Sequence, residues 1–352
     1  MTLALSYASG ASDKPLLGST IGEFFNYAVK HYSDREAIVS IHQQVRLTYW
    51  QLAERVNILA KAFIQADFKK GDRIGIWSPN NVEWLITQYA TAKVGLILVT
   101  INPAYRSHEL AYVLKQSGCK GLVLQNKFKS SNYEQMLCEL CPELRKVSPG
   151  KLVSKEFELL TTIISTTESP ISGIYSWDEF NYLGNESSDQ LLVSRLEDQD
   201  MDDPINIQYT SGTTGFPKGA TLSHHNILNN GYFVAETMNF DESDRLVVPV
   251  PLYHCFGMVM ANLGCLTHGA CAIYPSEAFE PEAVLNAVQK EKATALYGVP
   301  TMFIAELALP NFSEYELKTL RTGIMAGAPC PVDTMTQVNE KMNMTEVEIA
   351  YG

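Results

Sequence analysis

Short apolar stretches alternate with amphipathic stretches along most of the chain, and this alternation most constrains the fold. Strands are expected at residues 36–41, 45–48, 72–77, 97–101, 122–124, 205–210, 245–250, 270–274, 295–297 and 323–326. Helices are expected at residues 21–29, 49–63, 82–92, 257–267, 281–291, 301–309 and 332–342, and from residues 107 and 224 onward. Apolar strands separated by amphipathic helices are typical of parallel sheets with helices on both faces. We therefore predict an α/β fold.

Polar residues at fixed spacing mark where several of these helices begin. Thr20 with Glu23, and Thr48 with Gln51, have the spacing of a capping box, in which two side chains satisfy the first backbone N–H groups of a helix. Ser223 is expected to cap the helix that starts at residue 224.

The strand at residues 205–210 runs directly into a polar loop. Its side chains alternate, with Ile205, Ile207 and Tyr209 on one face and polar residues on the other. This period of two predicts a strand that packs on one side only.

The hydroxyl-rich loop, residues 210–218, has almost nothing to bury. It contains four hydroxyl side chains, two glycines and one lysine, and its only large apolar side chain is Phe216. Hydroxyls, uncovered backbone N–H groups and a fixed positive charge are the groups that hold polyphosphate oxygens. A solvated hairpin loop would have a similar composition. The loop is not a Walker loop, because Pro217 precedes Lys218 and Gly219 follows it.

Charge and cysteine usage exclude some functions. The net charge of −12, from 27 Lys and Arg against 39 Asp and Glu, argues against nucleic acid or an anionic membrane as the main partner. No apolar run reaches the roughly 18 residues that a transmembrane helix needs. Seven scattered cysteines fit a reducing compartment, and the Cys138/Cys141 pair is expected at a helix end stopped by Pro142 rather than in a metal site.

Two segments are expected outside the packed elements. Residues 1–18 are small and polar, and they are predicted to form a flexible leader without the features of a signal or transit peptide. Residues 186–203 are rich in Ser and Asp, and they are predicted to form a surface linker into the hydroxyl-rich loop. The sequence does not indicate an oligomeric state.

The run from Tyr209 to Gly219 resembles, residue by residue, the signature phosphate loop of the adenylate-forming (AMP-binding) superfamily. The runs GDRIGIW from residue 71, KVGLILVTINPAY from residue 93 and PLYHCFG from residue 251 also resemble landmarks of its acyl-CoA synthetase family. The resemblance covers residues 19–352 and is strongest to the mitochondrial medium-chain branch of that family. It implies the large N-terminal domain of an adenylate-forming enzyme, with layered sheets flanked by helices.

The resemblance also implies an activity and a set of binding residues. The expected reaction is ATP-dependent, AMP-forming ligation of a medium-chain fatty acid to CoA, with Mg²⁺ accompanying ATP. The residues expected to bind the nucleotide are Thr210, Ser211, Gly212, Thr213, Thr214, Gly215, Phe216, Pro217, Lys218, Gly327, Ala328, Pro329 and Tyr351. A mitochondrial location is implied, with the cytoplasm as the alternative.

In the family, the metal-binding Glu, the adenylation lysine and the small C-terminal domain follow the region that this chain matches. No catalytic residue or metal ligand is therefore assigned within residues 1–352, and Lys341 is expected to lie late in an ordinary amphipathic helix. The alternative function is a catalytically silent nucleotide-binding fragment or truncated isoform. Luciferase-like or peptide-synthetase chemistry is a minor alternative, because the hydroxyl-rich loop does not distinguish these enzymes.

Histidines and methionines near the PLYHCFG run have two interpretations. His254 either packs as an ordinary loop residue or gates the acyl site, as its place in this run implies. Met258 and Met260, with Phe256, either line an acyl channel or form plain core. His224, at a helix start, is expected to be structural together with the following His225.

Overall fold

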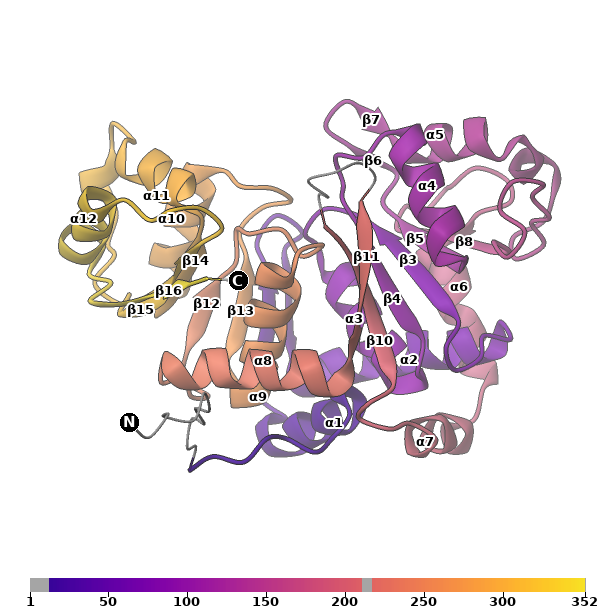
Figure 1. Ribbon diagram of the computed structural model, residues 1–352, viewed down its shortest axis with the longest axis horizontal. Helices are drawn as coiled ribbons and strands as arrows, with labels where there is room; N and C mark the ends of the chain where they lie inside the picture. The colour runs from indigo at the N-terminus through magenta and orange to yellow at the C-terminus, as the bar shows by residue number, and fades with distance from the viewer. Residues whose placement is uncertain (1–12, 211–216, 352) are drawn as a thin grey trace, which may run out of the picture.

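The computed structural model describes residues 13–210 and 217–351, and two large sheets with helices between and around them form its frame (Figure 1). Sheet A contains, in spatial order, β16 (Glu346–Ala350), β15 (Thr322–Ala326), β14 (Ala295–Gly298), β12 (Arg245–Val247), β13 (Cys271–Tyr274), β1 (Glu36–Ser40) and β2 (Val45–Thr48). Sheet B contains β11 (Lys218–Ser223), β10 (Pro204–Thr210), β4 (Ile97–Ile101), β3 (Arg73–Trp77), β5 (Cys119–Leu124), β8 (Thr162–Ser165) and β9 (Tyr175–Ser176). Within these two sheets, as far as the structure describes them, only the edge strands β2 and β11 pair in the antiparallel sense.

Helices cover both faces of both sheets, so the layers alternate as α/β/α/β/α. The helices of the central layer are α1 (Ile21–Tyr32), α2 (Tyr49–Gln65), α3 (Val82–Val94), α6 (Trp177–Leu183), α7 (Asp189–Glu197), α8 (His224–Thr237), the π-helix η3 (Phe256–Leu263) and α9 (Gly264–His268). The outer layer on sheet B contains α4 (Ser107–Ser117), α5 (Tyr133–Leu140) and the 3₁₀ helix η1 (Pro142–Lys146). The outer layer on sheet A contains α10 (Pro281–Glu291), α11 (Pro300–Leu307), α12 (Val332–Met342) and the 3₁₀ helix η4 (Phe312–Glu314).

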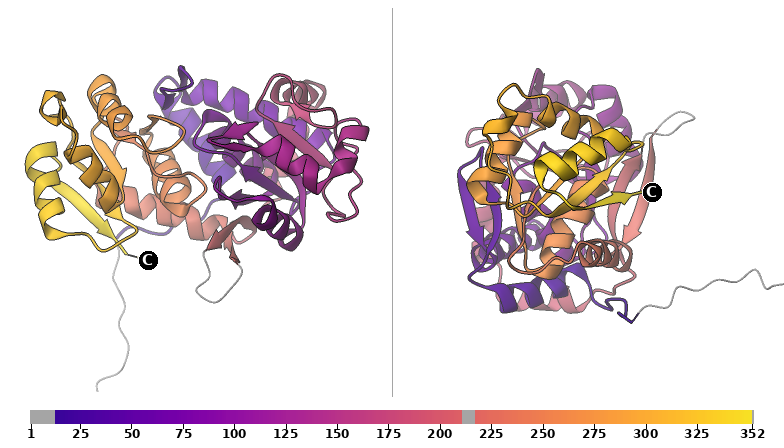
Figure 2. Two further views of the ribbon diagram at one scale, coloured as in Figure 1. Left: turned by 90° about the horizontal axis from the view of Figure 1, so that it is seen from above. Right: turned by 90° about the vertical axis from the view of Figure 1, so that its left-hand side faces the viewer.

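Three apolar cores follow from this layering. Along β3, Ile74 and Ile76 face the central core, whereas Trp77 faces the core beneath α4 and α5. Along β13, Tyr274 faces the central core and Ile273 faces the core beneath α10 and α12. Seen from above, the orange and yellow C-terminal half lies at one end of the long axis and the magenta half at the other (Figure 2). Strands buried on both faces explain why they appear in the sequence as nearly continuous apolar runs.

Most predicted elements are confirmed. The strand at 97–101 and the helices at 281–291 and 332–342 have the predicted bounds. Both capping boxes are present, with the Glu23 N–H donating to Thr20 and the Gln51 N–H to Thr48. Ser223 caps α8 as expected.

The prediction that β10 packs on one side is wrong. Asn206 and Gln208 are buried, whereas Ile207 and Tyr209 are only partly covered. The Asn206 side chain donates to the Leu98 carbonyl of the neighbouring β4 at 2.8 Å, which allows a polar group to lie in the interior.

The strand predicted at 245–250 ends early, at Val247. The Val248 N–H still donates to the Ile273 carbonyl, but Pro249 and Pro251 have no N–H with which to continue the ladder. Strands β8, β9 and β16 were not predicted from the sequence, and neither was the short hairpin of β6 (Lys127–Phe128) and β7 (Ser131–Asn132).

Two predicted loose segments contain ordered structure. The expected linker at 186–203 includes α7, whose Leu192 is buried, and the end of the 3₁₀ helix η2 (Gly184–Glu186). Residues 1–12 of the expected leader lie outside the described residues. Leu17 forms two backbone hydrogen bonds with the Asn229 side chain on α8, so the expectation of a flexible leader is wrong at this position. Among the described residues, no helix is long and apolar enough to cross a bilayer.

Candidate functional site

The predicted site residues that the structure describes follow strands β10, β12, β15 and β16. Thr210 ends β10, and Lys218 begins the antiparallel β11. Gly327 follows β15, His254 lies in the loop after β12, and Tyr351 follows β16. Carboxyl ends of strands are where α/β sheets bind ligands, because loops and helix starts converge there. Ser211, Gly212, Thr213, Thr214, Gly215 and Phe216 lie outside the described residues.

Both ends of the hydroxyl-rich loop are defined by the hairpin from which it projects. Thr210 and Lys218 are direct partners in the antiparallel register, and both are exposed. The Tyr112 hydroxyl on α4 donates to the Pro217 carbonyl at 3.2 Å, which ties the end of the loop to the outer layer. Within the described ranges, the Lys218 ammonium makes no ion pair.

The PLYHCFG run forms a compact turn that leads into η3. The His254 N–H donates to the Pro251 carbonyl at 3.3 Å, and the Gly257 N–H donates to the His254 carbonyl at 3.0 Å. A Cβ atom on Gly257 would lie 2.5 Å from the Pro251 carbonyl oxygen. Glycine is therefore required at this position, because the two ends of the turn approach each other closely.

His254 stands at this turn with one ring nitrogen already engaged. The Phe256 N–H donates to its Nδ1 at 3.1 Å, and the Cys255 sulfur lies 3.6 Å from the same nitrogen. Because Nδ1 accepts a hydrogen bond, the proton of the neutral ring is on Nε2. Desolvation by the surrounding protein lowers the pKa of His254, although the side chain is exposed. The ring is thus a neutral donor at physiological pH.

The apolar residues after His254 form core. Phe256 and Met258 are buried in the central core, and Met260 packs against it. The plain-core interpretation of these side chains therefore describes the structure, and the acyl-channel interpretation stays untested. Their helix is wound as a π-helix, and the Met258 carbonyl accepts a hydrogen bond from the buried Gln88 side chain at 3.1 Å. π-helical segments are frequent at functional sites.

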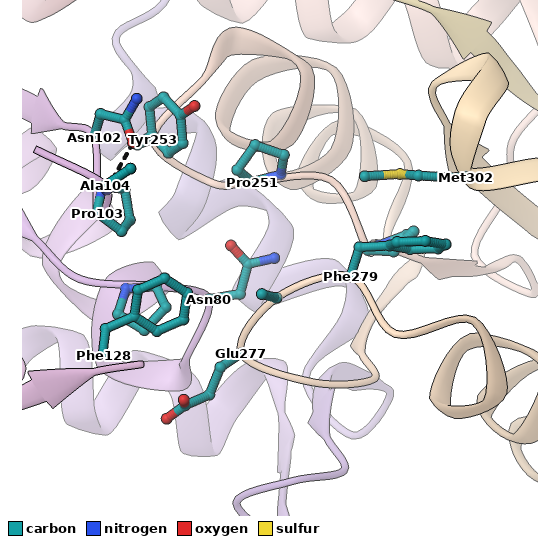
Figure 3. A pocket seen from close by; sticks show the side chains of 13 residues that line it. Asn80, Asn102, Pro103, Ala104, Phe128, Pro251, Tyr253, Glu277, Phe279 and Met302 are labelled. Carbon is teal, nitrogen blue, oxygen red and sulfur yellow. Dashed lines mark hydrogen bonds between the residues drawn. The ribbon is translucent and has the colours of Figure 1, made fainter. Parts of the chain in front are cut away.

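An apolar hollow of about 200 Å³ lies between loops of the two sheets (Figure 3). Its lining residues follow the carboxyl ends of strands and comprise Pro79, Asn80, Asn102, Pro103, Ala104, Phe128, Pro249, Pro251, Tyr253, Glu277, Ala278, Phe279 and Met302. Figure 3 shows sheet B segments in purple on one side and sheet A segments in tan on the other. Pro251 and Tyr253 belong to the PLYHCFG run, which the family resemblance connects with the acyl site, whereas the other lining residues were not predicted from the sequence. The available signal was their shared position just after predicted strands.

The wall formed by residues 102–104 is supported from the outer core. The Trp77 indole N–H donates to the Asn102 carbonyl at 3.2 Å, and the Tyr133 hydroxyl donates to the Pro103 carbonyl at 2.6 Å. The two rings stack with their centroids 3.7 Å apart. An Asn102 oxygen also accepts from the Ala104 N–H at 2.9 Å, which closes the turn.

The predicted adenine segment forms an exposed turn. Gly327, Ala328 and Pro329 are all exposed, and Gly327 has φ of 85°, a left-handed conformation that favours glycine. The neighbouring Cys330 thiol donates to the Met325 carbonyl at 3.3 Å. The Tyr351 side chain is fully exposed. The structure places these residues just after β15 and β16.

Other polar candidates serve the fold. His224 is buried, and its Nδ1 accepts the Ile21 N–H at 3.1 Å, which confirms its structural role. Cys138 and Cys141 are buried at the end of α5, where burial raises the pKa of the Cys141 thiol to about 11. Residues 13–210 and 217–351 contain no group of three or more His, Cys, Asp or Glu side chains that could hold a metal ion.

Comparison with known proteins gives close relatives over nearly the whole chain. A model of the AMP-binding enzyme family matches residues 25–352. YngI of Bacillus subtilis (strain 168), a candidate acyl-CoA synthetase, is 45% identical over 337 residues, which are 96% of this chain and 61% of that protein. The mitochondrial medium-chain acyl-CoA ligases ACSF2 of Mus musculus and Homo sapiens are each 42% identical over 354 residues, covering 99% of this chain and 57% of those proteins.

Solved structures share the fold. The anthranilate CoA ligase AuaEII, crystallised with anthranoyl-AMP, has a TM-score of 0.79 at 23% identity, covering 97% of this chain and 62% of that chain. The N-terminal domain of FACL13 from Mycobacterium tuberculosis has a TM-score of 0.72 at 21% identity, covering 95% of this chain and 76% of that chain. At such identities the similarity shows the α/β architecture alone.

Proposed function

The chain belongs to the AMP-binding enzyme family, and we propose that it acts in the ATP-dependent, AMP-forming ligation of a fatty acid to CoA. The relatives that support this activity are named for acyl-CoA synthetases and ligases. The chain spans 61% of the length of YngI and 57% of the length of mouse ACSF2. Activity, substrates and location therefore enter here as proposals.

One structural observation supports the proposal: the hydroxyl-rich loop starts at the carboxyl end of β10, and an apolar hollow lies just after the carboxyl ends of other strands. The ends of the hydroxyl-rich loop, Thr210 and Lys218, offer a hydroxyl and an ammonium to phosphate oxygens. The hollow beside Tyr253 offers mostly apolar surface to a flexible organic chain. A ligase that joins a nucleotide-activated acid to a long thiol needs both kinds of surface.

The proposed reaction has two steps. A carboxylate oxygen of the acid attacks the α-phosphorus of ATP, the bond to the bridging oxygen breaks, and pyrophosphate leaves. The sulfur of CoA then attacks the acyl carbon, the thiol proton is lost to solvent, and AMP leaves. Both steps place negative charge on phosphate oxygens, so preorganised donors stabilise them most.

We assign parts of this chemistry to named residues. The hydroxyl-rich loop and Lys218 hold the β- and γ-phosphates and then release pyrophosphate. The segment Gly327, Ala328 and Pro329, together with Tyr351, receives the adenine. His254 presents its Nε2–H at the acyl site, as the hydrogen bond from Phe256 to Nδ1 supports.

Mg²⁺ is proposed to accompany ATP as a counter-ion of its phosphates. The described residues contain no group of three or more His, Cys, Asp or Glu side chains that could ligate a metal. CoA is the second substrate. Its arm and the alkyl chain of the acid are both flexible organic chains, which suit the mostly apolar surface of the hollow.

The medium-chain preference and the mitochondrial location are also proposed from the ACSF2 relatives, whose names give both. Competition between octanoate and palmitate tests the first, with octanoate expected to be preferred. Fractionation of cells that express a tagged chain tests the second, and recovery in the cytosol alone would contradict it.

Acid-dependent exchange of radiolabelled pyrophosphate into ATP tests the activity directly. We expect exchange with octanoate and none without an acid. Calorimetry with ATP on the same preparation separates the alternatives. Binding of ATP without exchange would identify a nucleotide-binding chain without turnover, and no binding of any nucleotide would overturn the proposal.

A further inference from the structure

Asn80 lies where the two sheets meet at the apolar hollow. It follows β3 of sheet B and is 2% exposed. Its backbone N–H donates to the Glu277 carbonyl, after β13 of sheet A, at 3.1 Å. In Figure 3 it stands between the purple and the tan segments, beside Pro251 and Glu277. The backbone of Asn80, after β3 of sheet B, is therefore hydrogen-bonded to the loop that follows β13 of sheet A.

The Asn80 side chain forms hydrogen bonds with a second loop of sheet A, the loop that follows β12. Its amide nitrogen donates to the Val250 carbonyl at 2.9 Å, and its amide oxygen accepts the Leu252 N–H at 2.9 Å. These two peptide groups flank Pro251, and both residues are buried. The amide thus pairs with the segment as an adjacent strand would, using one donor and one acceptor.

The sequence of the segment explains why such a partner is needed. Pro249 and Pro251 have no N–H, so the chain cannot continue the ladder of sheet A after Val248. Buried backbone groups left without a partner are costly, by about 1–3 kcal/mol each. Asn80 supplies these partners from sheet B, two residues before His254.

We propose that Asn80 is a positioning residue, whose amide fixes the Val250–Leu252 segment against sheet B and so sets where Tyr253 stands at the hollow and where the following residue, His254, lies. The part concerning substrate rests on the proposed function. The positioning itself does not, because it concerns only the segment. The two can therefore be tested separately.

A second buried asparagine, on α8 and away from the hollow, provides a matched control. Asn229 on α8 accepts the Leu17 N–H at 2.7 Å and donates to the Leu17 carbonyl at 3.0 Å, which is the same two-point pairing. It is also buried. Its helix follows the end of β11 opposite the hydroxyl-rich loop, so removal of its amide changes a comparable contact away from the hollow.

Cysteine labelling measures the segment without reference to any substrate. Cys255 and Cys330 are the two partly exposed cysteines, and the other five are buried. Cys255 lies three residues after Leu252, whereas Cys330 follows β15 and serves as the internal reference. We expect Asn80→Ala to raise the rate of maleimide labelling at Cys255 relative to Cys330 by about fivefold or more, from the loss of two buried hydrogen bonds. Asn229→Ala should leave this ratio unchanged.

Calorimetry then tests the consequence for ligands. Asn80→Ala is expected to weaken binding of octanoate or of CoA by about five- to tenfold, with ATP affinity changed much less. Octanoate and CoA are titrated separately, so the experiment also shows which of them uses the hollow. If the unmodified chain binds none of the three, the proposed function fails, while the labelling ratio still decides the positioning.

Asn80→Asp provides a variant of the same shape. The introduced carboxylate can accept from Leu252 but cannot donate to Val250, and burial beside a carbonyl favours its protonation. The ratio of Cys255 to Cys330 labelling is measured for Asn80→Asp and for the unmodified chain at pH 8 and at pH 5.5. The ratio of Asn80→Asp should be closer to that of the unmodified chain at pH 5.5 than at pH 8. If Asn80→Ala folds and its labelling ratio equals that of the unmodified chain, the proposal is overturned. If Asn80→Ala does not fold, an unchanged ratio in Asn80→Asp at pH 8 overturns it.

Discussion

Thr210 and Lys218 face each other across the first antiparallel pair of the β10–β11 hairpin, and both side chains are exposed. The hairpin register therefore fixes both ends of the hydroxyl-rich loop, whatever ligand the loop binds. A hydroxyl and an ammonium held next to each other on paired strands suit the phosphate site that we propose.

The first prediction concerns Lys218. A charge-assisted hydrogen bond contributes about 1.5–3 kcal/mol, so Lys218→Ala should weaken ATP binding and pyrophosphate exchange by roughly ten- to a hundredfold. Lys341→Ala is the control, because Lys341 lies on α12 and donates to Gln337. Calorimetry with ATP measures the effect, and equal affinities for both variants would remove Lys218 from the phosphate site.

His254 should influence which acid is used. We expect His254→Ala to change the ratio of kcat/KM for octanoate over palmitate by about five- to thirtyfold, because one wall group of an acyl site is worth about 1–2 kcal/mol. Cys255→Ala, at the adjacent residue, is the control for local disturbance. A chain-length profile identical to that of the unmodified enzyme would show that His254 is only a packed loop residue.

Gly257 should not tolerate a larger side chain. Its Cβ would lie 2.5 Å from the Pro251 oxygen, so Gly257→Ala should destabilise the protein by about 1–3 kcal/mol. The control is Gly264→Ala, where the nearest atom would be 3.4 Å away. Urea unfolding measures both, and equal midpoints would contradict the close approach.

His224 should make the fold sensitive to acid. Burial lowers its pKa to about 4, with Asp203 opposing the shift, while an unfolded histidine titrates near 6.5. Between these values the unfolded chain binds the extra proton, so stability is present above pH ~6.5 and falls by about 3 kcal/mol as the pH approaches 4. Urea unfolding at pH 7.5 and 4.5 should show a smaller difference for His224→Gln. The exposed His31 provides the control, and His31→Gln should keep the full difference.

Lys93 should make the unfolding free energy increase with pH in the alkaline range, as His224 does in the acidic range. It is 4% exposed, donates to the Asn26 and Asn57 oxygens, and burial lowers its pKa to about 8. An unfolded lysine titrates near 10.4, so this group adds about 3 kcal/mol of stability as the pH rises from 8 to 10.4. The unfolding free energy of Lys93→Met should lack this rise. Lys30→Met, at an exposed position on α1, should retain it.

The sequence by itself determined most of the helices and strands and the polar composition of single loops. Periodicity and capping are local properties, so the helix at 281–291 and the capping box of Thr20 with Glu23 follow from neighbouring residues. The composition of the hydroxyl-rich loop likewise predicts its ligand class without a structure. Local patterns failed where burial depends on distant partners, as for Asn206 and Gln208 on β10.

Only the tertiary structure decided which groups meet at the site. Asn80 and the Val250 carbonyl are 170 residues apart in the sequence. They form a hydrogen bond because the crossover connections bring the loops after β3 of sheet B and β12 of sheet A next to each other. The hollow beside Tyr253 arises in the same way, from loops that each look ordinary in the sequence. Contacts across layers depend on how helices and sheets stack, and this packing has no period that a single chain segment could show.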